Sequence, residues 1–440
     1  MTRKLFGTDG VRGVAGELLT AELALGLARA ATAKTGADRP QVLIVRDTRE
    51  SGEMLQAAVA AGVSAAGGDA LLGGVLPTPA APLLIGRYGF DLAVVLSASH
   101  NSYEDNGIKF FAGDGYKLSD ESELAIEREL EHRGQPDNPS AIGRVRELRG
   151  AGEDYLRELH TRFSGLDLDG LDVLLDCANG ATYRVAPEIF RRLGAKVTVI
   201  ADKPDGRNIN ADCGSTHVGQ LGERVRNGRY GVGFAFDGDG DRVLAVDRTG
   251  TIVDGDELMA LTALHLRKQE RLNGGGVVVT VMTNYGFHSA MERAGVSVAI
   301  TKVGDRYVLE ELRARGWMLG GEQSGHIIDM SFNRTGDGIA GALLTLEALA
   351  GRDLSERDAM EKLPQRLVNV RVRERDALQS ATDVNEAVSA AGEALEGRGR
   401  VLVRPSGTEP LVRVMVEAPT DEEADEVCER LAALVERELG

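Results

Sequence analysis

Leu92-Ala93-Val94-Val95-Leu96 is a short apolar run that stops at the polar turn Ser97-Ala98-Ser99-His100-Asn101. An unbroken apolar run of this length predicts a strand that is buried on both faces of a sheet. The turn places one central hydroxyl, that of Ser99, directly beyond the carboxyl end of the strand. Ligands of α/β sheets bind at that end of the strands, so Ser99 is the first candidate for a functional residue.

The same unit recurs twice further along the chain, as a strand, a helix, a second strand and a third strand that ends in a polar turn. The predicted strands are 41–45, 70–72 and 92–96, then 173–176, 196–200 and 231–236, and finally 277–281, 296–300 and 317–319. The accompanying helices are predicted over 51–66, 185–193 and 287–294. This alternation indicates α/β domains with mixed or mainly parallel sheets. Because the polar turns follow equivalent strands, we expect three related α/β domains around one central cleft.

The last segment departs from this pattern. Strands are predicted over 367–372, 401–403 and 412–416, with a helix over 383–395 and an amphipathic helix closing the chain. This order predicts a smaller α+β domain. We therefore expect α/β domains at 1–150, 151–254 and 255–365, and a C-terminal α+β domain at 366–440.

Composition disfavours several classes of partner. The chain has 51 Lys and Arg against 68 Asp and Glu, a formal charge of −17, which argues against nucleic acid and anionic membranes as partners. Its three cysteines form no CxxC pair, which favours reduced thiols. No signal peptide is evident, and no run approaches the roughly 20 apolar residues of a membrane span. We expect a cytoplasmic protein that binds small molecules; a homodimer is compatible with the sequence.

Asp237-Gly238-Asp239-Gly240-Asp241-Arg242 is the polar turn of the second unit. Its alternating carboxylates can converge on one ion, and a set of oxygen ligands suits Mg²⁺ or Ca²⁺. An EF-hand loop would need Gly at position 6 and Glu at position 12, where this chain has Arg242 and Arg248. The residues that follow, 243–246, look like a strand and not like the exiting helix of an EF-hand. A plain acidic turn is the remaining alternative, but carboxylates this close repel one another without a cation.

Ser99 has two simpler explanations. Serine is common in turns, where it needs no catalytic role. The second explanation is that Ser99 and His100 belong to a Ser–His hydrolase. However, the chain lacks the G-x-S-x-G elbow of such enzymes, and the side chains of adjacent residues such as Ser99 and His100 diverge. The following Asn106-Gly107-Ile108-Lys109 supplies a cation for phosphate. Ser99 and the aspartate turn together suggest metal-assisted phosphoryl transfer through a phosphoserine.

Three further polar loops are candidate binding segments. Gly321-Glu322-Gln323-Ser324-Gly325-His326 offers groups that suit hydroxyl- and amine-bearing sugars, or is an ordinary polar loop. Arg404-Pro405-Ser406-Gly407-Thr408 combines a guanidinium, two hydroxyls and backbone N–H groups, as in a phosphate nest, with a surface turn as its alternative. The glycine-rich loop 6–13 carries Arg12.

Taken together, these five segments resemble the α-D-phosphohexomutase superfamily over the whole chain and in family order. The stretch 208–217, Asn-Ile-Asn-Ala-Asp-Cys-Gly-Ser-Thr-His, and Gln323 resemble the bacterial phosphoglucosamine mutases within it. The serine loop of the family usually has proline after His-Asn. This chain has Ser102 there and lacks the stiffening that proline would give.

The resemblance implies three related α/β domains and a C-terminal domain like the TATA-binding protein. It implies that glucosamine 6-phosphate and glucosamine 1-phosphate are interconverted through a phosphoserine and a bisphosphate, towards UDP-N-acetylglucosamine and peptidoglycan precursors. The implied catalytic residues are phosphorylated Ser99, His100, Lys109, Arg12 and Arg242. The implied Mg²⁺ ligands are Ser99, Asp237, Asp239 and Asp241. The implied sugar-binding residues are Glu322, Gln323, Ser324 and His326, and the implied phosphate-binding residues are Arg404, Ser406, Gly407 and Thr408.

Several alternatives stay open from the sequence. The enzyme could be a phosphoglucomutase/phosphomannomutase of the same superfamily, or the protein a non-catalytic sensor of sugar phosphates. The general base is one of Lys109, His100 and His326.

Overall fold

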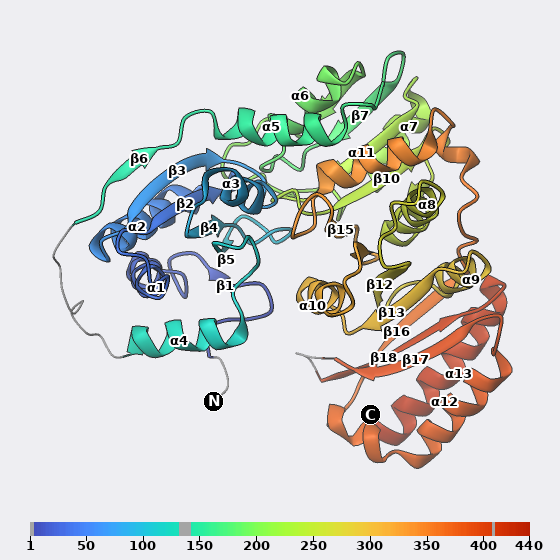
Figure 1. The fold of residues 1–440 in the computed structure, drawn as a ribbon. Coiled ribbons are helices and arrows are strands. Elements are labelled where there is room, and N and C mark those ends of the chain that lie inside the picture. Colours follow the sequence, from blue (N-terminus) through green and yellow to red (C-terminus); the bar gives the residue numbers. More distant parts are fainter. Residues whose placement is uncertain (1–3, 132–141, 407–409) are drawn as a thin grey trace. The chain divides into compact units, whose positions relative to one another are not determined.

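The computed structural model of the chain describes residues 4–131, 142–406 and 410–440 (Figure 1). It divides into two compact units. The first holds the residues up to Val281 together with Ala299–Arg357, and the second holds Met282–Val298 together with Asp358–Gly440. Each unit is described by itself below.

The first unit begins with a six-stranded mixed sheet. In spatial order its strands are β1 (Val11–Val14), β5 (Asp105–Ala112), β4 (Leu92–Leu96), β2 (Gln41–Arg46), β3 (Asp69–Val75) and β6 (Val145–Glu147). Its helices are α1 (Ala21–Ala33), α2 (Ser51–Ala65), α3 (Ala80–Tyr88) and α4 (Asp120–Glu131). Helices α1 and α2 pack together over one face, where Leu27 and Val59 join Ile44 and Val94 of the strands in one buried core (Figure 1).

Two further sheets follow. The second has the order β11 (Ile252–Val253), β10 (Val243–Asp247), β9 (Val232–Phe236), β7 (Asp172–Asp176) and β8 (Lys196–Ile200). The third has the order β13 (Ser297–Thr301), β12 (Gly276–Thr280), β14 (Leu319–Gly321) and β15 (Ile327–Asp329). The helices of this part are α5 (Ala151–Arg162), α6 (Val185–Arg192), α7 (Gly219–Asn227), α8 (Gly255–Lys268), α10 (Asp305–Arg315), α11 (Gly338–Leu349) and the 3₁₀ turn η1 (Leu354–Glu356). Helix α9 (Tyr285–Arg293) lies between them in the sequence but belongs to the second unit.

The three sheets share one strand pattern, as the sequence repeat predicts. The shared orders are β3-β2-β4-β5, β8-β7-β9-β10 and β13-β12-β14-β15. In each, the third strand of the repeat runs parallel to the first and is followed by an antiparallel strand. Every predicted polar turn is therefore the connection of a hairpin at the carboxyl end of a parallel strand.

Strand β14 begins two residues later than the sequence prediction of 317–319. The cause is the end of helix α10, where Gly316 adopts φ 66° and the N–H of Trp317 still donates to the carbonyl of Leu312. The helix end thus occupies residues that hydropathy assigns to the strand.

The second unit contains an antiparallel sheet in the order β16 (Gln365–Arg371), β18 (Leu411–Glu417) and β17 (Arg400–Pro405). The turn η2 (Arg375–Ser380) and the helices α12 (Thr382–Ala394) and α13 (Asp421–Leu439) complete it. Val412, Val414 and Val416 alternate along β18 and are fully buried in a core with α12 and α13. This is the α+β arrangement that the order of predicted strands and helices indicates.

Among the described residues, no helix is both long enough and apolar enough to cross a membrane.

Candidate functional site

Ser99 lies in the hairpin connection after β4 and is almost completely buried. Its backbone adopts φ 53°, in the left-handed region that non-glycine residues rarely occupy. Its Oγ donates to Oδ2 of Asp237 at 2.5 Å, and Nδ1 of the neighbouring His100 lies 3.5 Å from the same Oγ. The structure therefore joins the serine turn of the first sheet to the aspartate turn of the second.

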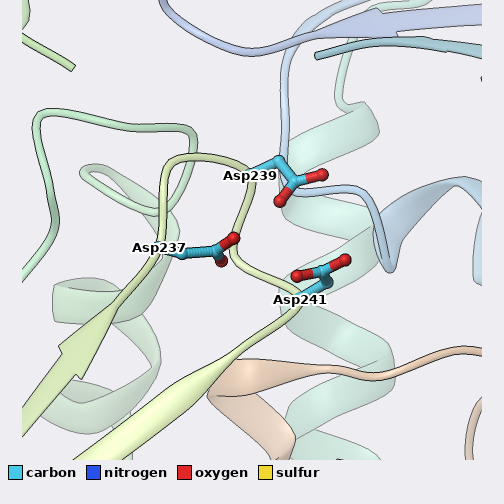
Figure 2. Close-up of side chains that lie close together, drawn as sticks. All are labelled: Asp237, Asp239 and Asp241. Carbon is cyan, nitrogen blue, oxygen red and sulfur yellow. The ribbon is translucent and has the colours of Figure 1, made fainter. Parts of the chain in front are cut away.

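Asp237, Asp239 and Asp241 lie in the connection between β9 and β10 (Figure 2). One ligand oxygen from each lies within 4.8 Å of the others, and all three side chains are buried. Among the described residues, Oδ1 of Asp239 and Oδ1 of Asp241 have no hydrogen-bond partner. Three buried carboxylates, two of which have an unused oxygen, fit a hard cation such as a divalent metal ion. Burial and the two neighbouring carboxylates raise the pKa of Asp237 well above its usual value, which a bound cation would oppose.

The two glycines of this turn meet different requirements. Gly240 adopts φ 71°, which glycine tolerates without strain. A Cβ at Gly238 would lie 2.6 Å from the carbonyl oxygen of Ser99 and 2.7 Å from Nδ2 of Asn210. Gly238 is thus needed because the aspartate turn packs directly against the serine turn.

Lys109 on β5 lies beneath the aspartate turn and is almost completely buried. Its Nζ lies 2.8 Å from Oδ2 of Asp239 and 2.8 Å from Oδ2 of Asp9. Burial disfavours the ammonium form, but the two carboxylates outweigh it and raise the pKa of Lys109, while the same ammonium lowers the pKa of Asp239. Lys109 is therefore a cation in this arrangement, and Thr78 adds a hydroxyl donor to Asp239 at 2.5 Å.

A cavity of about 380 Å³ opens beside the two turns. Its lining residues are Leu5, Gly7, Thr8, Asp9, Gly10, Arg12, His100, Asp241, Arg242, Val303, Gly304, Asp305, Glu322 and His326. Nε of Arg12 and Nε of Arg242 are buried without a hydrogen-bond partner among the described residues. Two guanidinium groups with unused donors suit an anionic ligand such as a phosphate.

The two histidines that line the cavity differ in their pKa shifts and in their hydrogen bonds. Burial, together with Arg242 and Arg12, lowers the pKa of His100 to about 4, so its imidazole is neutral at pH 7. His326 accepts the N–H of Gly336 on Nε2 at 3.1 Å, which leaves the ring proton on Nδ1, 3.5 Å from Asp241. His326 thus uses its ring to connect the third sheet to the aspartate turn.

The sugar-loop candidates are placed differently from one another. Glu322 lines the cavity, and its Oε1 accepts the N–H of Gly304 at 2.9 Å. The amide of Gln323 instead donates to Asp254, the N-cap of α8, at 3.3 Å. Ser324 also does not line the cavity in the part of the chain that the structure describes. Of this loop, Glu322 and His326 are the residues that face the cavity.

Two acidic lining residues were not candidates from the sequence. Asp9, from the glycine-rich loop, contacts Lys109, Arg12 and Lys117. Although burial opposes ionisation, these cations hold the pKa of Asp9 well below its usual value. Lys117 also pairs with Asp305 at the start of α10. The spacing of Asp9 and Arg12, three residues apart, is the only local signal of this cluster in the sequence.

The predicted phosphate nest lies in the second unit. Arg404 is directly opposite Arg413 on β18, and burial together with Arg413 lowers the pKa of Arg404. Ser406 is buried and its N–H donates to the carbonyl of Leu411 at 2.8 Å. Gly407 and Thr408 lie outside the described residues. Adjacent arginines on one sheet face would be stabilised by an anion.

Comparison with known proteins gives one consistent result. Four regions match the phosphoglucomutase/phosphomannomutase family: alpha/beta/alpha domain I over residues 3–137, domain II over 153–250, domain III over 254–367 and the C-terminal domain over 367–434. A phosphoglucosamine mutase of Moorella thermoacetica is 52% identical, covering 96% of this chain and 97% of the relative. That of Desulforudis audaxviator is 51% identical, covering 98% and 97%.

Solved structures share the fold. A phosphoglucomutase/phosphomannomutase family protein of Burkholderia thailandensis aligns with a TM-score of 0.81 at 22% identity, covering 98% of this chain and 97% of the other. N-acetylphosphoglucosamine mutase of Aspergillus fumigatus, in complex with GlcNAc-6P and magnesium, aligns with a TM-score of 0.69 at 18% identity, covering 100% and 96%.

Proposed function

The chain belongs to the phosphoglucomutase/phosphomannomutase family, and we propose that it interconverts glucosamine 6-phosphate and glucosamine 1-phosphate. The relatives named phosphoglucosamine mutase, about half identical over nearly the full length, support this substrate over glucose or mannose phosphates. The product would lead towards UDP-N-acetylglucosamine.

One observation carries the proposal: a buried hydroxyl, a carboxylate triad and a buried ammonium meet at the ends of two sheets. Ser99 donates to Asp237, and Lys109 donates to Asp239 of the same turn. Phosphoryl transfer depends chiefly on positioning and on stabilising negative charge. These contacts support Ser99 as the phosphoryl carrier, because they distinguish it from an ordinary serine in a turn.

The triad would hold Mg²⁺ through Asp237, Asp239 and Asp241. When bound, the ion would offset two of the roughly five negative charges of three carboxylates and a phosphoserine. Lys109 and Arg242 supply further positive charge next to the triad, and Arg12 supplies it across the cavity. These residues would orient the phosphoryl group between Ser99 and the sugar hydroxyl.

Transfer proceeds in two balanced steps. The P–O bond to Oγ of Ser99 breaks as a bond forms to the free sugar hydroxyl, whose proton passes through a base to Oγ, giving a bisphosphate. After the bisphosphate turns over, the P–O bond of its other phosphate breaks as a bond forms to Oγ of Ser99, and the proton of Oγ passes through the base to the sugar oxygen that is released. Lys109 is already an ammonium and Nε2 of His326 already accepts an N–H, so we propose His100, which lines the cavity with Nδ1 3.5 Å from Oγ of Ser99, as the base.

Residues of two loops would bind the rest of the substrate. Glu322, which faces the cavity, would bind sugar hydroxyls. Arg404, Ser406, Gly407 and Thr408 would bind the phosphate that is not transferred. The partners proposed are sugar phosphates, and a reducing cytoplasm suits the three free thiols of Cys177, Cys213 and Cys428.

Mass spectrometry of the Ser99 peptide tests the function. The purified protein should carry one phosphate on Ser99, and labelled glucosamine 6-phosphate should exchange it. Ser99→Ala should lose turnover while keeping the fold, since the side chain contributes a hydroxyl and no core contact. Substantial turnover by Ser99→Ala would refute the phosphoserine mechanism. Faster turnover of glucose phosphate than of glucosamine phosphate would instead assign the chain a phosphoglucomutase activity.

A further inference from the structure

We propose that Arg49 and Asn210 are positioning residues that hold the Ser99 backbone in its left-handed conformation and so keep its hydroxyl on Asp237. The inference builds on the proposed role of Ser99 as the phosphoryl carrier. Neither residue lines the cavity in the part of the chain that the structure describes, so both would act through Ser99.

The two side chains hold the same two carbonyl groups. The Ser99 carbonyl accepts from Nη2 of Arg49 at 3.0 Å and from Nδ2 of Asn210 at 2.9 Å. The Asn101 carbonyl accepts from the same nitrogens, at 2.9 Å and 3.0 Å. A guanidinium and an amide from different sheets thus hold both sides of His100 in the serine turn.

Arg49 is fully buried, and all five of its guanidinium N–H donors are used. Besides the two bonds from Nη2, Nη1 donates to the carbonyls of Ser102 and Asp105, the latter at 2.9 Å. Nε donates to Oδ2 of Asp47 at 2.8 Å, which balances the charge. Only the planar fork of arginine can make this set of bonds, since lysine has three donors on one atom.

The N–H of Ser99 is held as well. It donates to Oγ of Ser97 at 2.9 Å, and that hydroxyl donates to Oδ2 of Asp47. Both backbone polar groups of Ser99 are therefore bonded to buried partners. Such bonding opposes the relaxation of a residue whose φ of 53° is unfavourable for a side chain.

Asn210 belongs to the stretch 208–217, to which the proposed function gives no role. This stretch is anchored on the second sheet, where the N–H of Asn210 donates to Ala178 at 2.9 Å and the N–H of Ser215 donates to Phe236 at 2.8 Å. Asn210 itself adopts φ 57°, which asparagine tolerates better than most residues. The stretch thus carries an amide from the second sheet to the serine turn of the first.

The hydrogen bonds from Arg49 and Asn210 to the Ser99 carbonyl also support the aspartate turn. Gly238 packs so closely that a Cβ there would lie 2.6 Å from the Ser99 carbonyl and 2.7 Å from Nδ2 of Asn210. A shift of the Ser99 carbonyl would therefore alter the packing of Asp237 and Asp239 as well. The bond from Arg49 to the Ser102 carbonyl restrains the turn where this chain lacks the usual proline of its family.

Asn210→Gly is the sharpest test, because glycine keeps the left-handed backbone and removes only the amide. We expect kcat to fall about tenfold or more, as for the loss of two buried hydrogen bonds, with KM for glucosamine 6-phosphate within about threefold. In full-length dephosphorylated protein, hydrogen exchange over 97–105 should quicken by about tenfold, with β2 unchanged.

Asn208→Gly is the matched control, because Asn208 lies in the same stretch and donates its amide to Lys203. Arg49→Lys should reproduce the Asn210→Gly phenotype if it folds. Equal loss of kcat in Asn208→Gly and Asn210→Gly would assign the effect to the stretch as a whole and overturn the proposal. Unchanged kcat and exchange in Asn210→Gly would overturn it too. Because the exchange measurement needs no substrate, it tests the positioning role of Asn210 even if the unaltered protein proved to lack mutase activity.

Discussion

Lys109→Met should strongly destabilise the metal-free protein, because it removes the buried ammonium from between two carboxylates. Nζ lies 2.8 Å from an oxygen of Asp239 and 2.8 Å from an oxygen of Asp9. At an effective dielectric constant of about 20, each contact is worth about 6 kcal/mol before desolvation. Because desolvation offsets much of this, the expected net loss is about 3–5 kcal/mol, as for removal of one partner from a buried ion pair.

A double-mutant cycle isolates the interaction. Lys109→Met, Asp239→Asn and the double variant would be unfolded in guanidinium chloride with a chelator present, and the free energies of unfolding compared. The coupling energy between positions 109 and 239 should be about 2–3 kcal/mol. Lys109→Met alone leaves the charge of Asp239 buried without its partner, whereas the double variant removes that charge as well. Arg46→Met, at a half-buried arginine on strand β2 of the same sheet, is the control. A coupling energy below about 0.5 kcal/mol would refute the charge assignment of this site.

Three further predictions concern other parts of the molecule. Asp239→Asn should raise the Mg²⁺ concentration needed for half-maximal activity while changing KM for the sugar phosphate little; an unchanged metal dependence would move the ion elsewhere. Arg404→Ala should raise KM about tenfold to a hundredfold, the effect of losing a charge-assisted bond worth roughly 1.5–3 kcal/mol, and added glucosamine 1,6-bisphosphate should partly restore the rate. Normal KM with no rescue would make Arg404 part of a surface turn. Burial raises the pKa of Asp337 to about 6, so the folded state binds its proton more tightly than the unfolded state. Stability should therefore fall by about 3 kcal/mol as pH rises from about 4 to 6, and Asp337→Asn should abolish that dependence in thermal unfolding at a series of pH values. An equal slope in both proteins would show that Asp337 is not its source.

The sequence predicts the strands that end at the serine and aspartate turns because the signals are local. Apolar runs such as 92–96 cannot remain exposed, and the turns that follow them interrupt the run. The three aspartates alternate with glycines in a tight turn, so their convergence hardly depends on the rest of the chain. The domain boundaries at 150, 254 and 365 stay predictions, since the compact units follow a different division, with 282–298 joined to the C-terminal segment.

The partners of the charged and amide side chains could not be predicted in this way. Lys109 is a cation near the serine turn by sequence, but its partner Asp239 is 130 residues away. Gln323 fits a sugar loop by sequence, whereas its amide is used at the N-terminus of α8. A side chain of this length reaches several polar groups, and the backbone path decides which.

By itself, the sequence determined the threefold repeat, the hairpin turns that end its buried strands and the chemical groups that these turns carry. These features follow from hydropathy and backbone preference over a few residues, which act before any long-range contact forms. Only the tertiary structure decided which turn meets which, as when Asn210 reaches the Ser99 carbonyl from 111 residues away. Hydrogen bonds and ion pairs act over a few ångströms, so their pattern exists only once packing has brought separate sheets together.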